Sequence, residues 1–280
     1  MQENLKRELA EKACRIRMGV IEGTFHAKSG HPGGSLSIAD VLAYLYFKEM
    51  RLDPKNPKWD DRDRFVLSKG HCAPALYAAL ALRGYFSWDE LKTLRHPGAM
   101  LQGHPDMKGT PGVDMSTGSL GQGVSAACGM ALAGKLSDRD YRVYAILGDG
   151  EIEEGQVWEA AMFAAHRKLD NLCLLIDNNG LQIDGKISEV CSPYPIDEKF
   201  RAFGFHVIVI NGHNFDEIEA AYEEAKTVKG KPTAIISLST KGKDVTFMED
   251  RVEWHGAAPN EEQYQIAMND LNAILNSIKE

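Results

Sequence analysis

The feature that most constrains the fold is a pair of polar motifs, Gly148-Asp149-Gly150 and Asn178-Asn179, separated by 27 residues. Residues 141–147 and 171–176 are short apolar runs, typical of buried strands, and residues 153–168 between them carry apolar side chains at helical spacing. A strand, a helix and a strand in this order form a parallel pair with a right-handed crossover. We therefore expect both motifs at the carboxyl edge of one sheet, where open α/β sheets bind ligands.

The residue types in these motifs favour a diphosphate that is held through a divalent cation. Glycines allow close approach of the backbone, and a helix N-terminus attracts phosphate. Asp149 would repel a bare diphosphate, whereas Mg²⁺ takes oxygen ligands and commonly bridges carboxylate and phosphate. We expect a carboxylate oxygen from Asp149, an amide oxygen from Asn179 and a backbone carbonyl just after Asn179.

Two other interpretations of the same motifs stay open at this point. Gly148-Asp149-Gly150 and Asn179-Gly180 are also typical of ordinary turns. Gly148-x-Gly150 could also begin a dinucleotide fingerprint, but Glu153 then occupies the position that needs a third glycine or alanine. Asp149 would also face the pyrophosphate in that arrangement.

Composition excludes several classes of protein. The 280 residues are 44% hydrophobic and 26% charged, which is ordinary for a globular chain. A net charge of −8 argues against nucleic acid or an anionic membrane as a partner. The N-terminus lacks an apolar signal core, and no apolar run approaches membrane-spanning length. Five scattered cysteines without a Cys-x-x-Cys motif favour a reduced, cytoplasmic protein, and we expect Cys72, beside His71, to be buried.

The pattern along the chain predicts an α/β fold, a doubly wound parallel β-sheet flanked by helices, in one domain over residues 1–280. Strands are predicted over residues 65–67, 141–147, 171–176, 205–210 and 233–238. Helices are predicted over residues 5–27, 37–50, 72–82, 87–94, 120–136, 153–168, 215–228 and 260–278. Ser37-x-x-Asp40 resembles a capping box at the start of the second helix, and residues 183–187 resemble a small hairpin turn. Residues 95–118 form a long unpatterned stretch, which is usually functional or disordered.

Histidines gather in the glycine- and proline-rich loops. Five of the nine lie there: His31, His71, His104, His213 and His255. Neutral histidine can hydrogen-bond phosphate or sugar hydroxyls and can transfer protons near pH 7. No pair has the His-x-x-x-His spacing of a zinc site. A local cap or turn contact explains any one of them, His213 above all, but repeated placement at strand ends indicates a shared site.

Five motifs in their order along nearly the whole chain resemble the transketolase family. They are Ser29-Gly30-His31-Pro32-Gly33, Ser68-Lys69-Gly70-His71, Gly103-His104-Pro105, Thr117-Gly118-Ser119-Leu120-Gly121-Gln122-Gly123 and the unit from Gly148 to Asn179. Each alone is a weak signal, and together they are specific. The resemblance implies the thiamine diphosphate-binding fold of the diphosphate (PP) module.

The resemblance also implies a role for individual residues. Mg²⁺, for which Ca²⁺ or Mn²⁺ can substitute, would be held by Asp149, Asn179 and the carbonyl of Leu181. His71, Gly150 and His255 would contact the diphosphate of thiamine diphosphate. The rest of the cofactor would meet Gly118, Ser119, Leu120 and Ile183, and Glu154 would belong to a carboxylate relay between paired sites. His31, His104 and His255 would be catalytic and face the ketose donor.

The chain departs from the family pattern in two respects. Ser35-Leu36 and Ser119 replace residues that are common in the family, an Ala-Pro pair and a proline. The sequence ends at Glu280, before the modules that carry the glutamate for the aminopyrimidine ring and the basic residues for the sugar phosphate. The resemblance therefore implies the N-terminal subunit of a split transketolase, nearly inactive alone.

The implied reaction is transfer of a two-carbon ketol unit from a ketose phosphate to an aldose phosphate, as in the pentose phosphate pathway. It would need a C-terminal subunit with the pyrimidine-binding module, in a heterotetramer with two of each subunit. Two alternatives remain open: a related synthase or a transketolase for an unusual sugar phosphate or sulfosugar, and a cofactor-binding protein without turnover.

Overall fold

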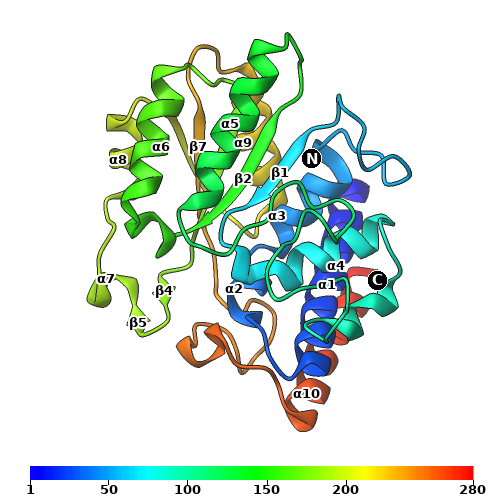
Figure 1. The fold of residues 1–280 in the computed structure, drawn as a ribbon. Coiled ribbons are helices and arrows are strands. Elements are labelled where there is room, and N and C mark those ends of the chain that lie inside the picture. The colour runs from blue at the N-terminus through cyan, green and yellow to red at the C-terminus, as the bar shows by residue number, and fades with distance from the viewer. Residues whose placement is uncertain (280) are drawn as a thin grey trace.

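A five-stranded parallel sheet forms the centre of the molecule (Figure 1). The computed structural model describes residues 1–279, and Glu280, the last residue of the predicted domain, lies outside them. The order across the sheet is β1 (Arg64–Leu67), β2 (Val143–Gly148), β3 (Leu172–Asn178), β7 (Thr233–Leu238) and β6 (His206–Asn211). All five predicted strands are confirmed, and every pairing between them is parallel.

Helices cover both faces of the sheet, which confirms the doubly wound arrangement. One apolar core lies between the sheet and α5, α6 and α8, and the other lies between the sheet and α1, α3, α4, α9 and α10. The α-helices are α1 (Glu3–Ala27), α2 (Pro32–Leu36), α3 (Ala39–Tyr44), α4 (Ala73–Arg83), α5 (Gln122–Leu136), α6 (Gly155–His166), α7 (Ile187–Val190), α8 (Ile196–Ala202), α9 (Phe215–Thr227) and α10 (Glu261–Lys279). A π-helix, η1 (Leu45–Glu49), and 3-10 helices η2 (Gly70–Cys72), η3 (Trp88–Thr93), η4 (Glu151–Glu153) and η5 (Val252–His255) complete the helical elements. No helix within residues 1–279 is long and apolar enough to cross a membrane.

Strand residues alternate between the two cores because successive side chains of a strand point to opposite faces. Tyr144 and Ile146 of β2 lie in the core of α1, whereas Val143, Ala145 and Leu147 lie in the core of α5. Both cores are apolar and buried, and between them the sheet positions the loops that follow each strand at its carboxyl edge.

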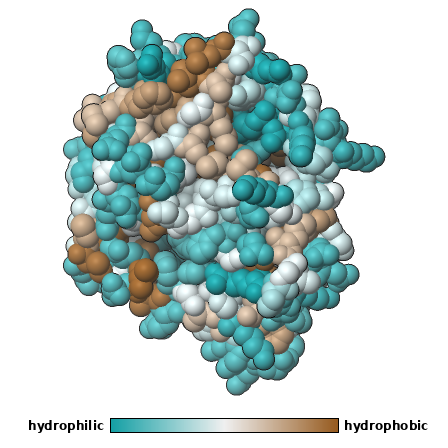
Figure 2. All heavy atoms as spheres, in the orientation of Figure 1, coloured by the Kyte–Doolittle hydropathy of each residue, from teal (hydrophilic) through white to brown (hydrophobic). Residues whose placement is uncertain are grey.

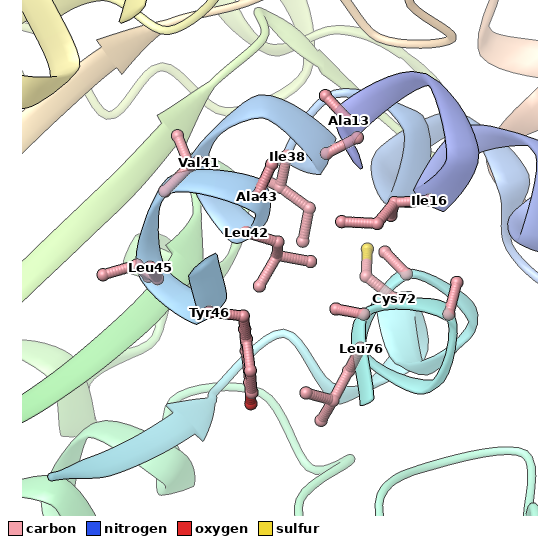
Figure 3. Close-up of a cluster of buried hydrophobic side chains, with 14 of the residues drawn as sticks. Ala13, Ile16, Ile38, Val41, Leu42, Ala43, Leu45, Tyr46, Cys72 and Leu76 are labelled. Carbon is pink, nitrogen blue, oxygen red and sulfur yellow. The ribbon is translucent and has the colours of Figure 1, made fainter. Parts of the chain in front are cut away.

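The core that contains α1 packs around Cys72, which follows His71 in the loop after β1. Figure 3 shows Ala13 and Ile16 of α1, residues of α3, and Cys72 and Leu76 around one apolar cluster. Cys72 is fully buried, as expected, and burial raises the pKa of its thiol. Its packing places the adjacent His71 at the carboxyl end of β1.

Several local predictions need correction. The helix predicted over residues 37–50 is divided into α3 and η1, and α2 forms just before it without having been predicted. The capping box is wrong because neither polar side chain caps a helix. The hydroxyl of Ser37 donates to Asp177, and the carboxylate of Asp40 pairs with the buried guanidinium of Arg17. A buried charge requires a counter-ion, so this tertiary pairing displaces the local cap. Helices α7 and α8 were not predicted, whereas the hairpin is confirmed as β4 (Leu181–Gln182) and β5 (Gly185–Lys186).

Candidate cofactor and active site

A cavity opens at the carboxyl ends of the central strands, where the sequence predicts a site. Ten predicted site residues line it: His31, His71, Gly118, Leu120, Asp149, Gly150, Asn179, Leu181, Ile183 and His255. The cavity is also lined by Gly148 of the first motif and by five residues that the sequence analysis did not assign to the site: Gly34, Lys69, Glu151, Gln182 and Lys241. Loops after β1, β2, β3 and β7 therefore converge on one space.

Asp149 joins the two motifs that the sequence analysis paired. Its carboxylate is buried and accepts hydrogen bonds from the backbone N–H of Gly150, at 2.9 Å, and of Gly180, at 2.6 Å. Burial and the nearby carboxylate of Asp177 raise the pKa of Asp149 to about 7. A cation beside Asp149 would favour its ionised form.

Asn179 and Leu181 line the same cavity. The side-chain oxygen of Asn179 accepts a hydrogen bond from the N–H of Leu181, and the carbonyl of Leu181 accepts one from Lys241 Nζ at 3.2 Å. Carboxylate, amide and peptide oxygens together fit a hard divalent cation such as Mg²⁺. Within residues 1–279 no group of three or more His, Cys, Asp or Glu side chains could hold a metal ion, so a transition-metal cluster of those ligands is not formed there.

Three histidines from three separate segments line the cavity, and a fourth, His104, lies beside them. The ring centroids of His31 and His71 are 5.2 Å apart, as are those of His71 and His255, and His31 is 5.4 Å from His255. His104 does not line the cavity but lies 6.5 Å from His31. His213 is elsewhere: its ring binds the carboxylate of Asp40 and the N–H of Thr240, which are long-range contacts outside the shared site.

These histidines are held in their neutral form. Burial lowers the pKa of His31 to about 4, with His71 and Arg95 adding to the effect. Burial and Lys69 lower the pKa of His71 to about 4, and burial and Lys241 lower that of His255 to about 3. Burial and Arg95 also lower the pKa of His104. A neutral imidazole has one donor and one acceptor nitrogen, which suits contact with hydroxyl groups.

Two buried lysines beside the cavity were missed by sequence reasoning. Lys69 pairs with Asp177 at 2.6 Å, and this partner outweighs burial and raises the pKa of the amine. Lys241 donates to Leu181, lies 3.0 Å from His255 Nδ1, and has its pKa lowered by burial. Lys69 stands inside the quoted Ser68-Lys69-Gly70-His71 motif, but Lys241 has no local signal because its surroundings come from distant segments.

Glu151 was also missed, and it connects three loops. Its carboxylate accepts hydrogen bonds from Ser68 Oγ at 2.5 Å, from the N–H of Gly121 at 3.0 Å and from the N–H of Gly148 at 3.0 Å. A glutamate just after a strand resembles an exposed helix start, so its burial follows only from the tertiary structure. Three predicted residues, His104, Ser119 and Glu154, do not line the cavity, and their roles stay predictions.

Gly70 allows two of the site loops to touch. A Cβ atom on Gly70 would lie 2.7 Å from Thr117 Oγ1 and 2.8 Å from the backbone nitrogen of Gly118. Distances below 3 Å are not compatible with a side chain there. The absence of a side chain at this position therefore brings the loop of His71 against the loop of Gly118.

The known proteins that resemble this chain in sequence agree with one another in the family that they indicate. The family model described as "Transketolase, thiamine diphosphate binding domain" matches residues 9–272. The 6-deoxy-6-sulfo-D-fructose transketolase subunit SqwG of Clostridium sp. (strain MSTE9) is 51% identical over 94% of this chain and 96% of its own length. An apulose-4-phosphate transketolase subunit of Phocaeicola vulgatus is 41% identical over 97% of this chain and 96% of its own.

A solved structure agrees in fold with these sequence relatives. The transketolase of Campylobacter jejuni subsp. jejuni superposes with a TM-score of 0.89 at 34% identity. The match covers 96% of this chain and 45% of that chain, so the present chain spans about half the length of that transketolase.

Proposed function

This chain belongs to the transketolase family, and from that premise we propose that it is the cofactor-binding subunit of a split transketolase. Both relatives that it covers almost completely carry the word "subunit" in their names. The observation that carries the proposal is the single cavity in which Asp149, Asn179 and the neutral histidines His31, His71 and His255 meet. The family match favours a thiamine diphosphate site over the dinucleotide interpretation of the Gly148 motif.

We propose that the cofactor and a divalent cation are held by this chain's own oxygens and nitrogens. Asp149, Asn179 and the carbonyl of Leu181 would bind Mg²⁺, because the donor set is entirely oxygen. A cation on the Leu181 carbonyl would compete with Lys241 for that oxygen, so we expect the amine to turn to the diphosphate. His71, Gly150 and His255 would contact the diphosphate as well.

The chemistry that thiamine diphosphate supplies when bound is a stabilised carbanion for cleavage and formation of carbon–carbon bonds. The residues of this chain would position the ketose beside the cofactor and exchange protons with it. His31, His104 and His255 would donate hydrogen bonds to, and accept them from, hydroxyls of the ketose, since a low pKa keeps each ring neutral. Gly118, Ser119, Leu120 and Ile183 would lie against the cofactor rings, and Glu154 would form a relay between paired sites.

We propose unusual anionic ketoses as substrates in place of the pentose phosphate pathway sugars. The relative named for 6-deoxy-6-sulfo-D-fructose has the higher identity, 51%, and the second is named for apulose-4-phosphate, at 41%. A sulfonate or phosphate at the far end of the sugar would need cationic side chains. We assign those to a partner protein, together with the acid for the aminopyrimidine ring.

The partner in this proposal is a C-terminal transketolase subunit with the pyrimidine-binding module. Figure 2 shows apolar surface near the β4–β5 hairpin and α7, and a separate apolar area over the upper ends of α5 and α6. The exposed large apolar side chains of the hairpin and α7 are Ile183 and Val190, and Ile183 is 65% exposed at the cavity itself. Such a patch supports a protein partner that covers the cavity. We further propose a heterotetramer with two copies of each chain. The cytoplasmic location of the protein stays a prediction.

A reconstitution experiment tests the proposed function. The chain and a candidate C-terminal subunit would be purified separately and mixed with thiamine diphosphate and Mg²⁺. Ketol transfer would then be measured with 6-deoxy-6-sulfo-D-fructose, apulose 4-phosphate and fructose 6-phosphate as donors. We expect transfer only in the mixture, and none with Asp149→Ala in place of the parent chain. Full transfer by this chain alone would overturn the split-enzyme proposal, and failure to bind the cofactor in any mixture would support a different role.

A protein that binds the cofactor without turnover is a weaker candidate. It would need the diphosphate side of the cavity but not the sugar side. His31 and His104 are brought together from segments more than 70 residues apart, and a remnant without a substrate gives no reason for that arrangement.

A further inference from the structure

Asp177 is a carboxylate beside the cavity that the proposed cation site does not use. It ends the buried part of β3 and is fully buried behind the cavity wall. Four donors reach it from four segments: Ser37 Oγ at 2.7 Å, Lys69 Nζ at 2.6 Å, Asn179 Nδ2 at 2.9 Å and Ser239 Oγ. Three of these donors reach Oδ2 and one reaches Oδ1, so both oxygens of Asp177 are already engaged by side chains of this chain.

The hydrogen bond to Asp177 determines which way the amide of Asn179 faces. Its nitrogen donates to Asp177 Oδ2, and its oxygen therefore lies on the opposite side, where it accepts from the N–H of Leu181. A reversed amide would put the side-chain oxygen of Asn179 against the carboxylate, where oxygen faces oxygen. The same reversal would turn an NH₂ group, which cannot bind a cation, toward the cavity.

The remaining donors attach the cavity loops to the same carboxylate. Lys69 also donates to the carbonyl of Gly34 at 2.9 Å, and Ser37 Oγ lies 3.0 Å from that carbonyl. Ser239 stands two residues before Lys241. Segments that carry His31, His71, Asn179 and Lys241 are thus linked through one buried group.

We propose that Asp177 is a positioning residue, which holds the amide of Asn179 with its oxygen toward the cation of the cofactor site. The proposal rests on the proposed function, since it needs the cation site of Asp149, Asn179 and Leu181. Partners that orient a metal ligand typically contribute about 10- to 100-fold to metal affinity. Asp177 acts through Asn179 and touches neither cation nor substrate.

The test uses Mn²⁺ as the probe, followed by electron paramagnetic resonance in the presence of thiamine diphosphate. Asp177→Asn alone leaves Lys69 buried without its counter-ion, so the double variant Lys69→Met/Asp177→Asn, which removes both charges, is measured beside it. A carboxamide at position 177 can donate to the oxygen of Asn179 and so permits the reversed amide. We expect both variants to need about 10- to 100-fold more Mn²⁺ than the parent.

Excess Mn²⁺ distinguishes positioning from general loss of structure. Asp149 and Leu181 remain in the variants, so cofactor binding should return at saturating Mn²⁺. The control variant Arg62→Met/Asp114→Asn removes another partly buried ion pair away from the cavity and should bind Mn²⁺ like the parent.

Three outcomes would overturn the proposal. The first is a parent-like Mn²⁺ requirement in Lys69→Met/Asp177→Asn, and the second is loss of cofactor binding at every Mn²⁺ concentration. If, in either of these two cases, the parent still binds Mn²⁺ and Asp149→Ala does not, the proposed function stands and only the positioning role of Asp177 is wrong. The third outcome is that the parent itself binds no Mn²⁺, which would contradict both the proposed cation site and the role of Asp177.

Discussion

The backbone N–H of Gly180 donates a 2.6 Å hydrogen bond to the carboxylate of Asp149, across 31 residues of sequence. This contact exists because β2 and β3 are parallel neighbours in register, with Gly148 opposite Asp177. The loops that leave the two strands therefore begin at the same level of the sheet. An expected cation ligand on one loop is held by the backbone of the next, which makes the geometry of the site a direct product of strand pairing.

Asp149→Ala tests the cation site at its centre. We expect cofactor binding to weaken by about 2 to 5 kcal/mol and to lose its dependence on Mg²⁺, because the carboxylate is the proposed charged ligand. Isothermal titration calorimetry with thiamine diphosphate, with Mg²⁺ and with a chelator, measures both effects. Asp184→Ala is the matched control, since Asp184 is an exposed acid on the adjacent hairpin turn. Unchanged, Mg²⁺-dependent binding in Asp149→Ala would remove this residue from the site.

His31 should make stability depend on pH in acid. Burial lowers the pKa of His31 to about 4 in the folded chain, whereas an unfolded histidine titrates near 6.5. Between these values the unfolded state binds more protons, so stability is full above about pH 6.5 and falls as the pH drops toward 4. His31→Asn should reduce the slope of melting temperature against pH in this window.

The control for this effect is His96→Asn, because His96 is exposed. Its slope should match that of the parent in scanning calorimetry from pH 7.5 to 4.5. An equal slope in His31→Asn and the parent would show that His31 is not held neutral by burial.

Lys241→Met separates cofactor binding from folding. Burial lowers the pKa of the Lys241 amine, and its hydrogen-bond partners in the structure, Leu181 and His255, are uncharged. A methionine there removes the cost of a buried amine, so we expect unfolding to need the same or more denaturant. Binding of thiamine diphosphate should weaken about tenfold or more, because a charge-assisted contact of about 1.5 to 3 kcal/mol is lost. Lys186→Met, with a side chain that is 69% exposed, should leave both quantities unchanged. Tight binding in Lys241→Met would place the amine outside the diphosphate site.

Sequence patterns predicted the parts of this molecule that depend on local periodicity and on loop chemistry. The five strands follow from apolar runs, and the meeting of Asp149 with Asn179 follows from the strand–helix–strand order. The pattern missed Lys69, Glu151 and Lys241, because burial of a charge is decided by partners from distant segments. Asp177 illustrates the limit: in sequence it is the end of an apolar run, yet four segments converge on its carboxylate.

Gly70→Ala, compared with Gly129→Ala, tests whether the close approach of two loops forms the site. A Cβ on Gly70 would lie 2.8 Å from the backbone of Gly118, and backbone cannot yield as a flexible side chain can. We expect a loss of about 1 to 3 kcal/mol in unfolding free energy from this overpacking. Cofactor binding should fall as well, because His71 and Gly118 are pushed apart.

Gly129 lies in α5 with no atom within 4 Å of the position of an added Cβ. Gly129→Ala should therefore stabilise the chain by about 0.4 to 1 kcal/mol, since alanine restricts the unfolded state and favours helix. Urea denaturation of the two variants gives both values on one scale. If Gly70→Ala unfolded like the parent and bound thiamine diphosphate as tightly, the contact between the loops of His71 and Gly118 would not be what shapes the cavity.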